Sequence, residues 1–516
     1  MDINILEQGS GIVTPEIISL ETSTIALKSD GTVWAWGQNN FGQLGQGNTA
    51  NSDYPVQVKN PAGTGYLTNI VQIKGGINHV VALSLDGTVY TWGLNSNGQL
   101  GNNTLINSTL PIKVEGLNNV RSIGAASGSS FAVMADGTVW GWGYNANGNL
   151  GDGTRVQRNT PFKTLYTNVV QIEGGVNFSL ALRADGTVWA AGRNYYGEIG
   201  SGGFATNVDY QNNTPVQVRG PNNVGMLQNI VKIAAGHNDA MALDKDGYVY
   251  AWGYGNYGGN GQGNTNNYGY PMQVKGGAQG TAYLQDIVDI GKLYPSNMAI
   301  DKDGNVYTWG YNANGNLGDG TTTNRTLPVK IMSNINALPM TDNTRGQTSF
   351  VLTSDGAIYA WGQNNQGQTG NGSNVNQLTP QEIFATYLAP EKRMEILKIG
   401  QSAEIEVHPI TPFNIANTVT VLGKLQYSSL NEDVATVDGN GNITAVRKRR
   451  NKNTYNRYKN RAADNGSCRC YIRCKWGSCY ADDIRSRYTY CYIKRRRHSM
   501  DSRSKQLWTA GNREYN

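Results

Sequence analysis

An eight-residue phrase that recurs seven times between residues 30 and 362 restricts the fold of this chain more than any other feature. It starts with Asp-Gly, continues with β-branched and aromatic residues, and ends with Gly, as in Asp30-GTVWAWG. The copies lie 49 to 61 residues apart and start at Asp30, Asp86, Asp136, Asp185, Asp246, Asp303 and Asp355. A period near 50 residues indicates a repeat architecture in which each unit is one supersecondary element.

Each unit has the pattern of a small antiparallel sheet. An apolar stretch such as Val80-VALS precedes the Asp-Gly, and the β-branched and aromatic residues that follow are typical of a strand. Asp-Gly predicts a two-residue hairpin turn between these strands. The unit then continues through N-x-x-G-x-L-G and a polar loop to a short P-x-x-V strand. About four short strands per unit predict one blade of a β-propeller, and seven units predict seven blades.

Two repeat positions are predicted to fill the space between neighbouring blades. The second aromatic residue of the phrase is Trp at Trp36, Trp92, Trp142, Trp252, Trp309 and Trp361. The Leu of N-x-x-G-x-L-G is Leu44, Leu100, Leu150 and Leu317. Ala191 replaces the Trp in unit four, and Asn260 and Thr369 replace the Leu in units five and seven, so we expect looser packing there. The strand at 379–384 is expected to pair with the first blade and close the ring.

The repeat resembles that of the regulator of chromosome condensation family, whose signature D-G-x-V-W-x-W-G-x-N-x-x-G-Q-L-G recurs over about residues 15–385 here. The resemblance implies an all-β, seven-bladed β-propeller for residues 1–390. Family members include a chromatin-bound exchange factor for a small GTPase, a plant ultraviolet-B photoreceptor and a bacterial inhibitor of β-lactamase. The exchange factor's inserted wedge and the photoreceptor's G-W-R-H-T motif are absent here, so the resemblance implies a structure rather than a particular activity.

Charge is distributed unevenly along the chain. Residues 447–516 hold 20 of the 43 Lys and Arg but 5 of the 37 Asp and Glu, which leaves 23 basic and 32 acidic residues in 1–446. An acidic body offers no basic surface to a nucleic acid, so no such partner is expected. The sequence contains no apolar run long enough to span a membrane, no recognisable signal peptide, and no indication of a homo-oligomer.

The sequence predicts no catalytic, cofactor or metal site. His79, His237 and His408 lack the spacing of metal ligands, and no phosphate-binding loop is present. Asp152 and Asp319 lie in Gly-rich loops where calcium is an alternative, but single carboxylates favour turn residues. We therefore expect a non-enzymatic protein.

The variable loops after each repeat phrase supply the candidate partner-binding residues. These are Tyr144, Arg193, Tyr195, Tyr196, Tyr254, Tyr257 and Tyr311. Tyr combines apolar area with a polar tip, which suits recognition of a protein or glycan partner on one propeller face. Two alternatives are a guanine-nucleotide-exchange-like regulator of a small GTPase and a polysaccharide-active propeller enzyme.

Residues 391–446 resemble the bacterial immunoglobulin-like domains of surface adhesins and secreted enzymes, in the stretch SSLNEDVATVDGNGNITAV. The resemblance implies a small β-sandwich, which stops one strand early here and leaves an unpaired edge. The combination of propeller and Ig-like modules predicts a larger modular bacterial protein that acts outside the cell or at its surface.

The tail, residues 447–516, contains all five cysteines and reads literally as a basic arm, a zinc site or a disordered segment. Its cysteine spacing fits no standard zinc pattern. Read one nucleotide later, 447–459 can encode the missing alternating strand, and 498–516 can encode another propeller repeat. At two places the shifted codon is fixed whatever synonymous codons are chosen. Met500-Asp501 gives Trp in the shifted frame and Trp508-Thr509 gives Gly, each where the repeat requires that residue. We therefore expect a frameshift near Val446 and a disordered tail.

Sequencing the parent DNA around codon 446 tests the frameshift. The expected result is one inserted base relative to a frame that continues through the Ig-like strand and into a new repeat. An uninterrupted frame that encodes residues 447–516 as they stand would contradict it.

Overall fold

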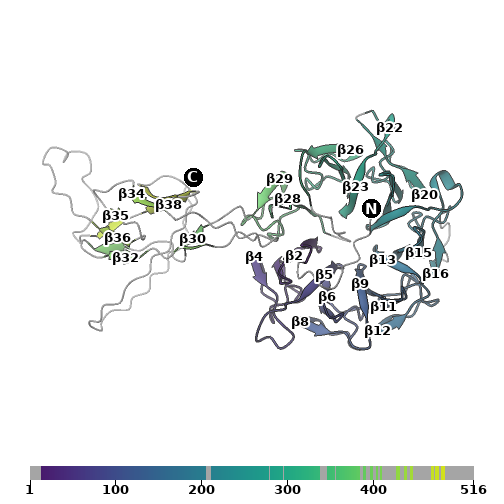
Figure 1. Cartoon of the computed structure of the whole chain (residues 1–516), viewed down its shortest axis with the longest axis horizontal. Helices are drawn as coiled ribbons and strands as arrows, with labels where there is room; N and C mark the ends of the chain where they lie inside the picture. The colour runs from purple at the N-terminus through teal and green to yellow at the C-terminus, as the bar shows by residue number, and fades with distance from the viewer. Residues whose placement is uncertain are drawn as a thin grey trace, which may run out of the picture. The chain divides into compact units, whose positions relative to one another are not determined.

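The computed structural model describes residues 13–383, apart from 205–210, 278, 294–295, 338–345 and 355, together with ten short strands between residues 388 and 482. The chain divides into two units, Met1–Ala385 with Phe413–Thr418, and Thr386–Pro412 with Val419–Asn516. The first unit is a β-propeller, in which seven antiparallel sheets surround a central axis (Figure 1).

Six blades have four strands, and the seventh has three within the described residues. The innermost strands are β1 (Glu16–Ser19), β5 (Ile70–Gly75), β9 (Val120–Ala125), β13 (Val169–Gly174), β17 (Ile230–Ala235) and β23 (Ile287–Leu293). The second strands are β2 (Ser23–Leu27), β6 (His79–Ser84), β10 (Ser129–Met134), β14 (Phe178–Arg183), β18 (Asp239–Asp244), β24 (Ser296–Asp301) and β27 (Thr348–Leu352). The third strands carry the repeat phrase: β3 (Val33–Gly37), β7 (Val89–Gly93), β11 (Val139–Gly143), β15 (Val188–Arg193), β19 (Val249–Gly253), β25 (Val306–Gly310) and β28 (Ile358–Gly362). The outermost are β4 (Ser52–Gln57), β8 (Ser108–Lys113), β12 (Arg158–Lys163), β16 (Gln211–Gln217), β20 (Tyr268–Gln273), β26 (Arg325–Met332) and β29 (Gln377–Ile383).

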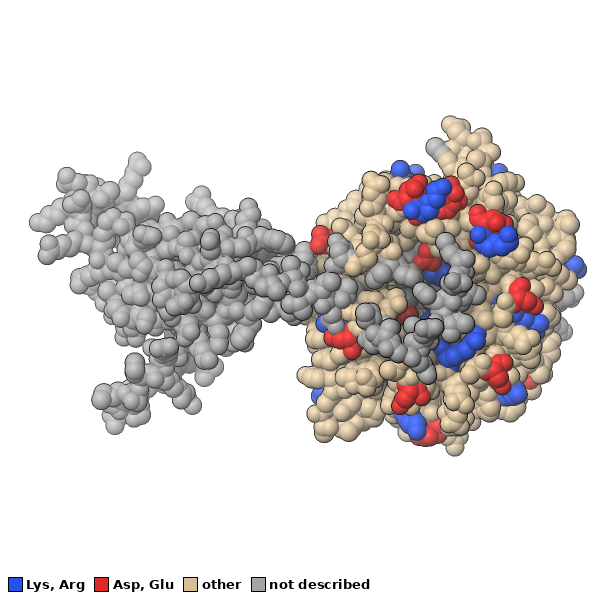
Figure 2. Space-filling model, viewed as in Figure 1, with Lys and Arg blue, Asp and Glu red and all other residues tan. Residues whose placement is uncertain are grey.

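The smaller elements of the first unit are the 3-10 helix η1 (Pro221–Asn223) and the pair β21 (Lys275–Gly276) and β22 (Ala282–Tyr283). No helix in the described part of the chain is long and apolar enough to cross a membrane. Figure 2 shows basic and acidic side chains beside one another at intervals around the ring, so the described residues of this face form no field of one sign.

The second unit contributes short paired strands. They are β30 (Leu388–Pro390), β31 (Ile396–Lys398), β32 (Ser402–Glu404), β33 (Val407–Pro409), β34 (Gln426–Ser429), β35 (Ala435–Val437), β36 (Asn442–Ala445), β37 (Ser467–Arg469), β38 (Tyr471–Lys475) and β39 (Ser478–Asp482). The other residues of 391–516 lie outside the described residues, so the Ig-like domain and the disordered tail stay predictions.

The turn at the Asp-Gly of the first repeat is one residue longer than the predicted two-residue turn. Lys28 N donates to Thr32 O at 2.9 Å, and Gly31 N donates to Lys28 O at 2.9 Å. Gly31 has a φ of 75°, which closes a three-residue loop. The predicted two-residue turn was wrong because Asp30 does not adopt the left-handed backbone conformation. Asp30 Oδ1 instead accepts the Thr32 N–H at 3.0 Å.

Every junction between neighbouring blades contains a hydrogen bond to one backbone carbonyl, that of the residue before the Leu position. In six junctions the donor is the indole N–H of the repeat Trp, at 2.8–2.9 Å. The pairs are Trp36 to Gln368, Trp92 to Gln43, Trp142 to Gln99, Trp252 to Glu198, Trp309 to Gly259 and Trp361 to Asn316. These tryptophans and the four repeat leucines are fully buried.

Within the described residues, the seventh and first blades exchange no strand where the ring closes. Gln368 O accepts both the Trp36 indole N–H at 2.8 Å and the Thr24 hydroxyl at 2.7 Å. Ile17 of the first blade and Phe350 of the seventh belong to one buried cluster. The predicted pairing of the last strand with the first blade was wrong, because β29 pairs with its chain neighbour β28 and the first blade is already complete with β1–β4.

The junction between the third and fourth blades lacks Trp, and Tyr166 fills the space. A Cβ placed on Gly151 would lie 2.7 Å from Tyr166 Cε2 and 3.3 Å from Ala191 Cβ. The Tyr166 hydroxyl lies 2.8 Å from Ser179 Oγ, and Ser179 Oγ donates to Asn149 O at 2.7 Å. This relay reaches the carbonyl that an indole reaches elsewhere. The expected loose packing at Ala191 was therefore wrong, since Ala191 and Tyr166 are fully buried.

The Leu replacements are also closely packed. Other repeats have an Asn six residues before the second Gly of the loop; Asn39, for example, donates to a carbonyl eleven residues later at 3.0 Å. Gly255 stands at this position in unit five, and a Cβ there would lie 2.6 Å from Asn260 Nδ2. Asn260 Nδ2 donates to Asn266 O at 2.9 Å and so takes over the bond. Asn260 is 1% exposed and Thr369 is 0% exposed, against the expected looseness.

Ionisable side chains lie on the innermost strands. Glu16 Oε2 accepts Ile73 N–H of the next blade at 2.7 Å. Lys74 pairs with Glu173 at 2.5 Å, and Lys232 pairs with Asp289 of the sixth blade. Burial raises the pKa of Glu16 to about 7, although the Ile73 N–H and the lysines act in the opposite direction.

A swap at the fourth blade tests the junction. Tyr166→Ala should lower the free energy of unfolding by roughly 3–5 kcal/mol, because it leaves a cavity. Adding Ala191→Trp should recover much of this loss, because the indole refills the space and can donate to Asn149 O. Chemical denaturation measures both. A double variant no more stable than Tyr166→Ala would contradict the assignment.

Stability should depend on pH through Glu16. Its folded pKa of about 7 lies above the ordinary value of 4.5, so its favourable contribution is complete below about pH 4.5 and is lost as pH rises through 7. Glu16→Gln keeps an acceptor for Ile73 N–H, as Gln72 and Gln171 do for the next blades. Between pH 4.5 and pH 8, the free energy of unfolding of the variant should rise by about 1–3 kcal/mol relative to that of the natural chain. A stability difference independent of pH would contradict this.

Candidate partner-binding site

Five tyrosines form a continuous row across blades four to six. They are Tyr195, Tyr196, Tyr254, Tyr257 and Tyr311. Successive ring centroids lie 4.7, 4.7, 5.8 and 5.0 Å apart, with interplanar angles of 87°, 63°, 72° and 66°. These are edge-to-face contacts, the geometry that aromatic quadrupoles favour. We refer to these five residues as the tyrosine row.

The repeat places these rings beside one another. Tyr254 and Tyr311 directly follow the Gly that ends β19 and β25, whereas Tyr196 and Tyr257 lie two residues after the Asn position of the following loop. The later position of one blade meets the earlier position of the next, as Tyr196 meets Tyr254 and Tyr257 meets Tyr311. The row therefore follows from repeat geometry wherever both positions hold Tyr.

Glu198 holds the first end of the row in place. Its carboxylate accepts the Tyr196 backbone N–H at 2.6 Å and Arg193 Nε at 2.9 Å, and its backbone carbonyl accepts the Trp252 indole. Burial raises the pKa of Glu198, against the effect of Arg193. The Arg193 guanidinium lies 5.6 Å from the Tyr196 ring centroid and also donates to Asn238. Arg193 is thus an anchored cation at the end of the row.

The row is accessible. Tyr195 is 59% exposed, and the other four tyrosines are partly exposed. Burial, followed by the neighbouring Tyr257, raises the pKa of Tyr254, so this hydroxyl stays neutral at physiological pH. The row offers ring edges, ring faces and neutral hydroxyls together.

Six of the seven predicted partner-binding residues lie together, and Tyr144 does not belong to the row. Its hydroxyl accepts from Asn147 Nδ2 at 3.0 Å within blade three. Asn147 occupies the loop position that holds Tyr in blades four and five, so no ring continues the row in this direction.

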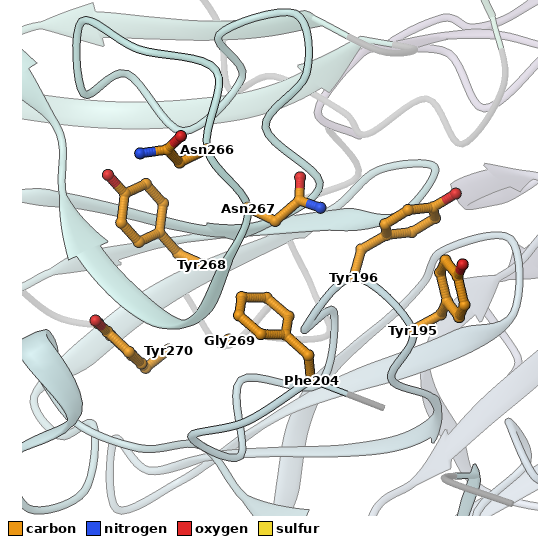
Figure 3. A pocket seen from close by; sticks show the side chains of 8 residues that line it. All are labelled: Tyr195, Tyr196, Phe204, Asn266, Asn267, Tyr268, Gly269 and Tyr270. Atoms are coloured by element: carbon orange, nitrogen blue, oxygen red, sulfur yellow. The ribbon is translucent and has the colours of Figure 1, made fainter. Parts of the chain in front are cut away.

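An open groove of about 840 Å³ lies next to the row between the loops of blades four and five (Figure 3). It is lined by Tyr195, Tyr196, Phe204, Asn266, Asn267, Tyr268, Gly269 and Tyr270. We refer to it as the aromatic groove. Phe204, Tyr268 and Tyr270 were not among the predicted residues, although they lie in the long variable loops of units four and five.

The candidate calcium loops are ion-paired turns. Asp152 and Asp319 each accept from the N–H two residues later and pair with Arg158 and Arg325 at 2.8 and 2.7 Å. His79 is buried with Nε2 3.0 Å from Ser130 Oγ, and burial lowers its pKa to about 4. The described residues contain no group of three potential metal ligands.

Comparison with known proteins places the chain in a family. A model of the RCC1-like domain matches residues 12–292, and a model of the regulator of chromosome condensation (RCC1) repeat matches 303–348 and 355–394. The ultraviolet-B receptor UVR8 of Arabidopsis thaliana is 30% identical over 371 residues, which cover 71% of this chain and 69% of the receptor. Protein RCC2 homolog of Danio rerio is 25% identical over an aligned region that covers 70% of this chain and 64% of that protein.

Other matches are more limited. The ligase HERC2 of Mus musculus is 28% identical over 58% of this chain but only 5% of the ligase, so the shared part is a small portion of that protein. Prp20p of Saccharomyces cerevisiae superposes with a TM-score of 0.56 at 22% identity, over 69% of this chain and 87% of Prp20p. Human WBSCR16 gives a TM-score of 0.56 at 19% identity, over 68% and 94% of the two chains. These two structures support the fold alone. With a domain model that spans more than half of its length and a relative 30% identical over most of it, this chain belongs to the RCC1-like family of β-propellers.

Proposed function

We propose that this chain is a non-enzymatic binding propeller that recognises a protein partner through the tyrosine row. The observation that carries the proposal is the unbroken edge-to-face contact of five accessible tyrosines across three blades. Relatives that share the whole propeller include a receptor, and Prp20p has been solved with Kap60 bound.

The row has the properties of an interface centre. Tyr supplies a large contact area for a small loss of conformational entropy, and it is enriched among the residues that dominate binding energy. Edge-to-face packing and the Glu198 hydrogen bonds hold the rings before a partner arrives, which reduces the entropy lost on binding.

A polysaccharide-active enzyme receives less support. Hydrolysis of a glycosidic bond ordinarily needs two carboxyl groups that flank the bond. Glu198, the carboxylate beside the row, is buried and committed to Arg193 and the Tyr196 N–H.

We also propose that the propeller acts outside a bacterial cell or at its surface. The support is the resemblance of residues 391–446 to bacterial immunoglobulin-like domains. Protease treatment of intact cells tests this: loss of the propeller without lysis is expected, and full protection would contradict it.

Site-specific photocrosslinking tests the proposed function. A benzophenone side chain at position 257 should yield a discrete, protease-sensitive adduct in cells that produce the native protein, because the row contacts a protein. The matched control carries the same group at Tyr66, which is 57% exposed on blade one. Combining the probe with Tyr254→Ala and Tyr311→Ala should reduce the adduct at least tenfold. Equal adducts at both positions, or none from the row, would contradict the proposal.

A further inference from the structure

We propose that the aromatic groove binds a proline-rich segment of the partner in an extended polyproline II conformation. This inference rests on the proposed function and names the chemistry that its partner presents. The groove shares Tyr195 and Tyr196 with the tyrosine row, so one partner can contact both surfaces.

The lining carries no charge. Its eight residues are four Tyr, one Phe, two Asn and one Gly. Arg193, next to the groove, is held by Glu198 and Asn238. A neutral lining does not offset the desolvation of an acidic or basic ligand, so it selects a neutral one. Its volume lies within the usual range of ligand-binding clefts, roughly 300–1,000 Å³.

The rings form ridges rather than a flat platform. Tyr195 and Tyr196 meet at 87° with centroids 4.7 Å apart, and Tyr268 and Tyr270 meet at 62° with centroids 6.3 Å apart. Figure 3 shows Phe204 between Tyr268 and Tyr196 in this view. The uneven apolar surface that these inclined rings form suits the compact rings of proline, and aromatic-lined grooves are the usual receptors of proline-rich segments. A sugar ring instead stacks on an open aromatic face.

Hydrogen-bond donors complete the match. Asn267 Oδ1 accepts the Gly255 N–H at 2.8 Å, which fixes the side chain and leaves Nδ2 without a partner among the described residues. Figure 3 shows this amide above Phe204, on the side of Tyr196. A polyproline II chain has no internal hydrogen bonds, and proline has no N–H, so such a ligand brings carbonyl acceptors that need donors. Asn267 Nδ2 is a donor of this kind, and the hydroxyls of Tyr195, Tyr196 and Tyr270 can also donate. The Tyr268 hydroxyl instead pairs with the Asn264 amide.

Fluorescence polarisation of fluorescein-labelled decaproline with the full chain tests the inference. We expect saturable binding that weakens at least tenfold in Phe204→Ala. Phe204 is 47% exposed, so its removal leaves the core intact. Asn267→Asp keeps the acceptor for Gly255 N–H but removes the donor, and binding should weaken about threefold or more. Tyr66→Ala should bind like the natural chain.

Two results would overturn the inference. One is decaproline binding weaker than about 1 mM, or binding unaffected by Phe204→Ala. The other is binding of N-acetylglucosamine hexasaccharide in place of decaproline with loss in Phe204→Ala, which would assign the groove to a glycan. If the adduct at position 257 persists while decaproline fails, the proposed function stands and only the groove's ligand is wrong.

Discussion

The structure depends on one acceptor that recurs at each blade junction, the backbone carbonyl that precedes the Leu position, and on the buried side chains that donate to it. The donor is a buried indole in six junctions and the Tyr166–Ser179 relay in the seventh. An unpaired buried carbonyl is costly, so each blade is held at one distance and one angle from its neighbour. The Trp36 and Thr24 donors therefore hold the first blade against the seventh where the ring closes.

The fixed spacing between blades also produces the tyrosine row. Loop residues at equivalent repeat positions lie at equivalent places around the propeller. An aromatic side chain directly after the third strand and another at the later loop position therefore meet at each junction between blades. Blades four to six satisfy the condition with Tyr196, Tyr254, Tyr257 and Tyr311. Blade three does not, because Asn147 stands where a ring is needed. The propeller supplies the spacing, and a few substitutions on it supply the binding surface.

Much of the fold was predictable from the sequence because each core position recurs in seven repeats. The Trp and Leu positions and the clustering of Tyr254, Tyr257 and Tyr311 on one face follow from the pattern. The compensations do not. Tyr166 replaces an indole from a loop of the preceding blade, and Asn260 supplies the amide that Gly255 lacks, so each depends on contacts that the local pattern does not encode. Phe204 and Tyr268 were missed for the same reason, because two loops of different blades build one groove.

Hydrogen exchange of the indole N–H groups in the Trp-labelled protein, followed by NMR, tests the central claim most directly. The account predicts that Trp36, Trp92, Trp142, Trp252, Trp309 and Trp361 exchange only when the propeller unfolds. Trp34 and Trp189, half-buried indoles that donate to a nearby Thr hydroxyl, should exchange much faster. Exchange of the six at the rate of Trp34 and Trp189 would contradict it, because the junction carbonyls would then not hold the blades.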